Sequence, residues 1–198
     1  ERVIWDMSYL VYKLQDAELA EQAIAENFGS DWTGPIRTMM GMVYLQYALD
    51  RPQEQEQWLT KADGLINNWT WGLLPVQDLR DPIPAYRLLL ETSRVRIDDV
   101  PRNGMHPLHS ASSAGDQPLV AAYLELGVDV NLEGCCGTPL ALALFCGSIP
   151  TANFLLRNGA EPAAAFNSQA QFDERMSRRS RSVRQDALEV LNHWGWKP

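Results

Sequence analysis

The first 68 residues carry apolar side chains at helical spacing. Gly29-Ser30-Asp31 and Gly34-Pro35 interrupt the pattern, and Pro52 stands where the start of a helix tolerates proline. We therefore expect four antiparallel helices, the second capped by Asp16 and the third running over Ile36–Leu49. The apolar faces of the first, second and fourth helices are marked by Ile4, Met7, Val11 and Leu14; by Leu19, Ala23 and Ile24; and by Trp58, Leu59, Ala62, Leu65 and Ile66.

Prolines divide the next stretch, residues 69–101, into short pieces. One short helix is expected over Pro84–Leu90, where Leu88-Leu89-Leu90 is too continuously apolar to face water. The pattern predicts two regions, a helical N-terminal region over 1–68 and a second region over 69–198. The pairing of Ile36–Leu49 with Pro52–Asn67 weakly resembles a tetratricopeptide-type helical hairpin.

The second region contains an internal repeat with a period of 32 residues. Identical residues recur in one fixed register: Pro107-Leu108 and Pro139-Leu140, Gly115 and Gly147, Pro118 and Pro150, Leu124 and Leu156, and Gly127 and Gly159. Proline suits the first turn of a helix, Thr138 can cap one, and glycine ends a helix in the left-handed conformation. Each unit is therefore a helix–turn–helix with a projecting turn, and the units must stack to bury their apolar faces.

The residues of these units resemble the ankyrin repeat family, most clearly over Pro101–Pro162. The first unit reads Gly104-Met105-His106-Pro107-Leu108-His109-Ser110-Ala111, and the second reads Gly137-Thr138-Pro139-Leu140-Ala141-Leu142-Ala143. The resemblance implies an all-α fold in which a helical N-terminal region precedes a short ankyrin-repeat solenoid. It also implies that His109 joins adjacent repeats by hydrogen bonds.

Two positions depart from the family pattern. His106 replaces the usual Thr, which leaves the helix cap open and would place an imidazole exposed on the binding face. Ala141 replaces the motif His, so the hydrogen bond between repeats is expected to be missing there. Degenerate flanking repeats are suggested by Val95–Asp98, which lies 33 residues before Val128–Asn131, and by Ala187–Leu191 with Gly195.

The charge of the chain narrows the possible partners. The formal net charge is −8, which argues against a general nucleic-acid binder, and no apolar run is long enough to span a membrane. Five arginines nevertheless fall between Arg175 and Arg184. This run could bind phosphate, an acidic partner or an anionic membrane surface, and the simpler interpretation is a solvated insertion that replaces a degenerate helix.

Catalytic and metal-binding motifs are not found in the sequence. Cys135, Cys136 and Cys146 form neither a disulfide framework nor a zinc motif, and we expect three free thiols. The remaining histidine, His193, has no neighbour that would complete a triad or an acid–base pair. We therefore expect no enzymatic activity, no cofactor and no metal. Only one member each of the pairs Trp69/Trp71 and Trp194/Trp196 should face inward.

The family resemblance places partner binding on the projecting turns and the first helices. Met105, Leu132 and Phe145 are large apolar residues at positions that such a fold tends to expose, and charged residues surround them. The partner-binding residues transferred position by position are Asp99, Arg102, Asn103, Met105, His106, Ser110, Ser113, Leu132, Glu133, Cys135, Cys136, Leu142 and Phe145.

These observations favour a binding module for one protein partner. The specific hypothesis is an inhibitor or immunity-type protein that neutralises an effector enzyme, and the excess of Arg over Lys hints at a bacterial source. A scaffold or adaptor fragment and a regulatory domain of an enzyme outside this chain stay open as alternatives. The sequence begins with Glu1 rather than Met, so we expect that a preceding segment was removed. That leaves a signal or lipid anchor, and the choice between periplasm and cytoplasm, open.

Overall fold

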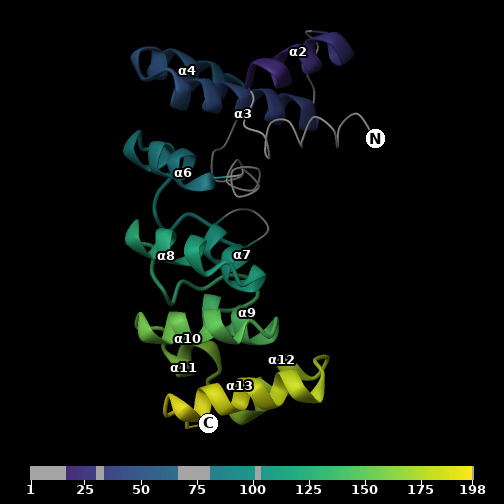
Figure 1. The fold of residues 1–198 in the computed structure, drawn as a ribbon, viewed down its shortest axis with the longest axis vertical. Coiled ribbons are helices and arrows are strands. Elements are labelled where there is room, and N and C mark those ends of the chain that lie inside the picture. The colour runs from purple at the N-terminus through teal and green to yellow at the C-terminus, as the bar shows by residue number, and fades with distance from the viewer. Residues whose placement is uncertain (1–16, 30–33, 67–80, 101–103, 198) are drawn as a thin grey trace. The chain divides into compact units, whose positions relative to one another are not determined.

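The computed structural model describes residues 17–29, 34–66, 81–100 and 104–197. Its contacts divide the chain into two compact units, Glu1–Arg96 and Ile97–Pro198. The described residues form helices and no strand, which confirms the expected all-α class (Figure 1). The first expected helix, the boundary near residue 68 and the Trp69/Trp71 pair lie outside the described residues.

In the first unit, a long central helix holds the other helices. Helix α3 (Gly34–Asp50) packs against α2 (Ala17–Phe28), α4 (Gln55–Leu65) and α6 (Pro82–Glu91), and the short 3-10 helix η2 (Pro52–Glu54) links α3 to α4. The helices expected around residues 36–49 and 84–90 are thus confirmed. The expected apolar face of α2 is wrong at Leu19, which is 45% exposed, because α2 buries its small residues Ala17 and Ala20 together with Ile24.

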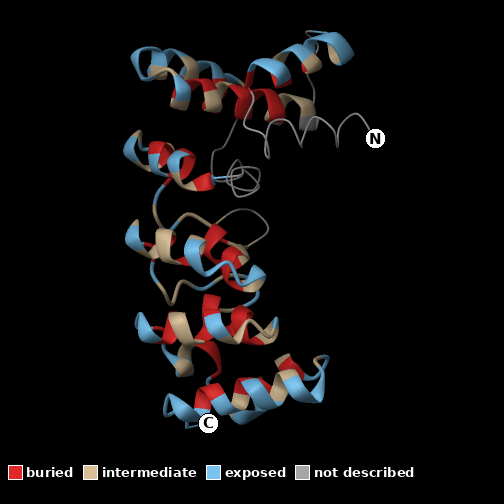
Figure 2. Cartoon of the chain, viewed as in Figure 1, coloured by how far each residue is buried: buried red, intermediate tan, exposed pale blue. Residues whose placement is uncertain are grey.

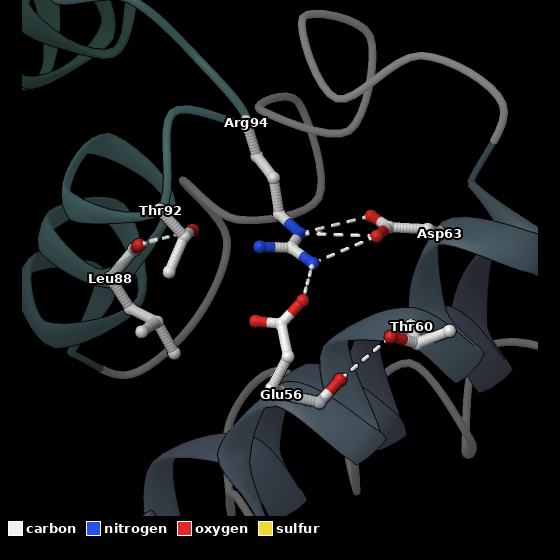
Figure 3. A network of polar contacts seen from close by, with 6 residues as sticks. All are labelled: Glu56, Thr60, Asp63, Leu88, Thr92 and Arg94. Carbon is white, nitrogen blue, oxygen red and sulfur yellow. Dashed lines mark hydrogen bonds and ion pairs between the residues drawn. The ribbon is translucent and has the colours of Figure 1, made fainter.

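An arginine fastens the turn after α6 to α4. The Arg94 side chain is only 12% exposed, and its Nε and Nη2 atoms donate to both carboxylate oxygens of Asp63 at 2.8–3.2 Å. Nη2 also lies 3.2 Å from Glu56 Oε1 (Figure 3). A planar guanidinium suits this two-pronged recognition of a carboxylate, which makes the contact stronger than an ordinary surface ion pair.

The second unit stacks helix pairs in layers (Figure 1). The first pair is α7 (Pro107–Ala114) with α8 (Gln117–Glu125), and the second is α9 (Pro139–Phe145) with α10 (Ile149–Arg157). Helix α9 packs against α7, α10 and α13 (Arg181–His193), so that every residue over 139–144 is buried (Figure 2). The short helices α11 (Pro162–Ala165) and α12 (Gln169–Met176) precede α13.

The local signals of the repeat act as the sequence predicts. Thr138 caps α9, where its hydroxyl accepts from the Ala141 N–H at 3.3 Å. Gly115 ends α7 in the left-handed conformation, with φ of 76°. At the C-terminal end, Trp196 is buried and donates to the Phe166 carbonyl at 2.7 Å, whereas Trp194 is exposed, which confirms the expected alternation of this pair.

The Arg94 contacts lead to a first prediction. Arg94→Ala leaves Asp63 and Glu56 without their cation and should lower the free energy of unfolding by about 1–2 kcal/mol. Urea denaturation followed by circular dichroism measures the change. The matched control is Arg87→Ala on the exposed face of α6, which should stay within about 0.5 kcal/mol of the parent chain. Equal losses in the two variants would contradict a specific role for Arg94.

Candidate functional site

A tight hairpin turn projects between the two helix pairs of the second unit. Gly134 and Gly137 each donate to the other's carbonyl at 3.1 Å, so Cys135 and Cys136 are the two residues of the loop. Cys135 N also donates to the Gly104 carbonyl, at 2.7 Å. A Cβ atom on Gly134 would lie 2.5 Å from that same carbonyl oxygen, so only glycine allows the backbones of the two turns to approach this closely.

His109 holds this turn to the preceding helix pair. Its side chain is fully buried on α7, and Nε2 lies 3.1 Å from the Gly137 carbonyl. Because a carbonyl can only accept, Nε2 is the donor. Burial lowers the pKa of His109, which keeps the imidazole neutral. The structure thus confirms the role that the sequence assigned to this residue.

His106 is buried and caps α7. Its exposed fraction is 0%, and Nδ1 accepts from the Leu108 N–H at 3.1 Å, as a capping side-chain oxygen would. The expectation that His106 lies exposed on the binding face is therefore wrong, because the imidazole points inward to the cap. Burial, followed by the neighbouring His109, lowers the pKa of His106 to about 4. A backbone hydrogen bond to Ile97 and the nearby Asp99 act in the opposite direction and raise this pKa.

An arginine bonds the same turn from its other side. Arg175, in the last turn of α12, donates from Nη1 to the Cys136 carbonyl at 3.0 Å. Ala141 has no side chain that could make a hydrogen bond between repeats, and the contact across the following layer comes from Arg175 instead. Arg179 also contacts the repeats, with its guanidinium carbon 4.6 Å from the centre of the Phe145 ring.

The interpretation of the arginine run as a solvated insertion is therefore wrong for Arg175 and Arg179. The run spans the end of α12, the connecting turn and the start of α13. Arg184 pairs with Asp173 at 2.8 Å, and only Arg178 and Arg181 of the run are exposed.

The turn, α9 and α12 enclose a hollow of about 380 Å³, called here the central hollow. Carbon and sulfur dominate its walls, and one guanidinium stands at its side. The residues that line it are Cys135, Cys136, Leu142, Phe145, Phe166 and Arg175. A second hollow of about 590 Å³ shares Phe145 and Arg175 with the first and is lined further by Gln171, Glu174, Ser177 and Arg178.

The structure gathers part of the expected binding surface at the central hollow. Cys135, Cys136, Leu142 and Phe145 line it, although Leu142 is only 8% exposed. Arg102 and Asn103 lie outside the described residues. His106 is buried, as described above. The other expected residues are at least partly exposed and do not line either hollow: Asp99, Met105, Ser110, Ser113, Leu132 and Glu133.

Sequence reasoning missed Phe166 and Arg175 as parts of this site. No signal within the repeat indicated Arg175, because this side chain reaches back to the turn that His109 already bonds. Phe166 follows α11, outside the clear repeat, and packs edge-on against Phe172 with ring centres 5.1 Å apart.

The central hollow is equipped for binding rather than for acid–base chemistry. Its walls offer aromatic and aliphatic surface, two thiols and one guanidinium, which together can receive an apolar group. Within the described ranges, no three His, Cys, Asp or Glu side chains are grouped so as to hold a metal ion. The same ranges contain no helix long and apolar enough to cross a membrane.

Layered helix pairs with projecting turns define a helical repeat protein of the kind that binds other proteins. Residues 80–165 match the family model for ankyrin repeats (3 copies). This segment belongs to the ankyrin repeat family, as its residues predicted, and is a protein-binding module. The match begins upstream of Pro101 and includes α6, which supports a degenerate repeat there. No curated protein matches the chain.

The low pKa of His106 gives a prediction for the pH dependence of stability. The unfolded histidine takes up a proton below about pH 6.5, whereas the folded one resists protonation until about pH 4. The unfolded state therefore binds more protons in this window, and stability falls as the pH falls through it. Between pH 7 and pH 5, His106 should contribute a loss of about 2 kcal/mol.

Urea unfolding at the two pH values checks this prediction. His106→Thr restores a capping hydroxyl and should remove most of that loss, although the variant is less stable at pH 7. His193→Ala, which removes an exposed histidine, should leave the loss unchanged. The prediction fails if His106→Thr and the parent chain lose the same stability between pH 7 and pH 5.

The contribution of Arg175 to stability can be tested by removing its guanidinium group while keeping the aliphatic part of the side chain. Arg175→Met leaves the Cys136 carbonyl without its donor and should lower the free energy of unfolding by about 1 kcal/mol. Arg178→Met, at an exposed position of the same run, is the control and should change it by less than about 0.5 kcal/mol. Denaturation in urea compares them, and a larger loss for Arg178→Met would contradict the assignment.

Proposed function

We propose that this protein is a non-enzymatic inhibitor or immunity-type protein that binds one protein partner, such as a bacterial effector enzyme, and neutralises it. The observation that carries the proposal is the central hollow, which is open and apolar and lies between the hairpin turn, α9 and α12. A hollow of about 380 Å³ admits one or two large side chains of a partner. Residues buried in such pockets supply most of the binding energy of an interface.

The surroundings of the hollow suit one specific partner. Met105 is partly exposed next to Gly104, and Leu132 and the charged, exposed Glu133 directly precede the hairpin turn. An apolar centre with a polar rim is the usual arrangement of a specific interface. The net charge of −8 would speed association with a basic partner, because opposite charges raise the encounter rate.

The local charge refines this picture. Arg175 and Arg178 line the second hollow together with Glu174, so two positive charges and one negative charge lie near Phe145. A partner segment with a large apolar side chain flanked by an acidic residue would match both features. The rest of the partner's contact surface is expected to be basic.

Affinity purification from the source cells, with the full chain as bait, identifies the partner. Met105→Asp, Leu132→Asp and Phe145→Asp each place a charge on the apolar centre and should weaken binding at least tenfold, as measured by calorimetry. Leu19→Asp, the same kind of change at an apolar residue 45% exposed in the first unit, is the control and should bind normally. Unchanged binding by all three variants would show that the partner sits elsewhere.

Inhibition is a separate measurement on the purified pair. The activity of the partner enzyme should fall to near zero at one chain per enzyme, and co-expression should protect a cell from it. A partner that keeps full activity in the complex would replace inhibition by the scaffold or adaptor alternative. A partner region encoded within the same gene would favour a regulatory domain instead.

A further inference from the structure

The loop of the hairpin turn presents two neighbouring thiols in one direction. The Sγ atoms of Cys135 and Cys136 lie 3.3 Å apart, and both residues are exposed at the edge of the central hollow. We propose that this pair is a binding site for trivalent arsenic carrying one organic substituent, held by both sulfurs with the substituent in the central hollow. This inference does not rest on the proposed function.

Hydrogen bonds from three sides fix the backbone of the turn that carries the two thiols. Gly104 accepts from Cys135 N, Arg175 donates to the Cys136 carbonyl, and His109 donates to the Gly137 carbonyl. Three different parts of the unit thus hold one loop of two residues. The backbone of the loop therefore has little conformational freedom left to lose when a ligand bridges the sulfurs, and such preorganisation strengthens binding.

A direct disulfide is the less favourable use of this pair. Neighbouring Cα atoms are about 3.8 Å apart, below the roughly 4.4–6.8 Å that disulfides usually span. Insertion of one atom between the sulfurs relieves this strain. It also leaves the turn, and therefore its contacts with His109 and Arg175, undisturbed.

The distance between the sulfurs indicates which centre fits. With sulfur bonds of about 2.3 Å, as to a soft metal centre, a separation of 3.3 Å corresponds to an angle of about 90° at the bridging atom. A tetrahedral ion would need roughly 3.8 Å between the sulfurs and a linear one roughly 4.6 Å. Trivalent arsenic is pyramidal with bond angles near 90°, prefers sulfur donors, and has one bond left for a third group.

The central hollow supplies a place for that third group. Leu142, Phe145 and Phe166 line it with apolar surface next to the thiols. A volume of about 380 Å³ is enough for a phenyl ring or an alkyl chain. An organic substituent therefore adds affinity that inorganic arsenite, with a hydroxyl as its third group, does not gain.

The binding step is an exchange of ligands without oxidation or reduction. Two arsenic–oxygen bonds of R–As(OH)₂ break, two arsenic–sulfur bonds form, and the thiol hydrogens leave with the two hydroxyl groups as water. The hydrogen bond with Cys136, and next burial, raise the pKa of Cys135, so that this thiol is protonated at neutral pH.

Phenylarsine oxide added to the full chain tests the proposal. Intact mass spectrometry should show one phenylarsenic group gained for two thiol hydrogens lost. A dithiol such as ethanedithiol should remove it, and a monothiol should not. Cys135→Ser and Cys136→Ser should each lower the affinity at least a hundredfold, whereas Cys146→Ser, which removes the third exposed thiol, should bind normally.

Two further measurements distinguish binding that depends on the folded structure from the general reactivity of two neighbouring thiols. The chain unfolded in urea should bind at least tenfold more weakly than the folded chain. Phe145→Ala, checked for folding by circular dichroism, should weaken binding of phenylarsine oxide about fivefold and leave binding of arsenite unchanged. The proposal is overturned if Cys136→Ser binds like the parent chain, if folding makes no difference, or if Phe145→Ala weakens both ligands equally.

Discussion

The repeat array depends on the hydrogen bonds that satisfy the backbone of its projecting turns. A turn of this kind has too few residues to pair all of its own carbonyl and N–H groups, and an unpaired buried group is costly. Here the hairpin pairs Gly134 with Gly137, and Cys135 N donates to the Gly104 carbonyl. His109 from the layer before adds a second donor to the Gly137 carbonyl, and Arg175 from the layer after donates to the Cys136 carbonyl. The stacking of layers and the position of the binding surface therefore have one common cause.

The two side chains that bond the turn, those of His109 and Arg175, differ in length, charge and exposure. His109 is a short, buried and neutral ring, so its bond fixes the distance between two helix pairs. Arg175 is longer, charged and partly exposed, and the same guanidinium also forms a wall of the central hollow. A contact that stabilises the stack is thus also part of the surface that a partner meets.

Much of the second unit could be predicted from the sequence because its signals are local. Helices α7 and α9 begin at Pro107 and Pro139 as expected, and the Thr138 cap depends on residues within one helical turn. The local pattern alone led to the incorrect prediction that the His106 side chain is exposed. An imidazole nitrogen can accept from a helix N–H as a Thr hydroxyl does, and only the packed structure shows that the ring is inside.

The central hollow could be predicted only in part. Cys135, Cys136, Leu142 and Phe145 belong to the clear repeat, so a family resemblance could assign them to the binding face. Arg175 contacts the turn from 39 residues away along the chain, and no spacing rule within one helix or turn predicts such a contact. In the first unit, Leu19 was misplaced because two alanines, Ala17 and Ala20, allow the helix to pack closely on another face.

The close approach of Gly104 and Gly134 has a consequence for how this surface can evolve. Because neither position tolerates a side chain, substitutions within this turn that preserve the stack fall on Cys135 and Cys136, between Gly134 and Gly137. The loop therefore has two variable positions on a backbone whose conformation is fixed. New recognition chemistry can be introduced there one side chain at a time, while the backbone contacts of the turn stay the same.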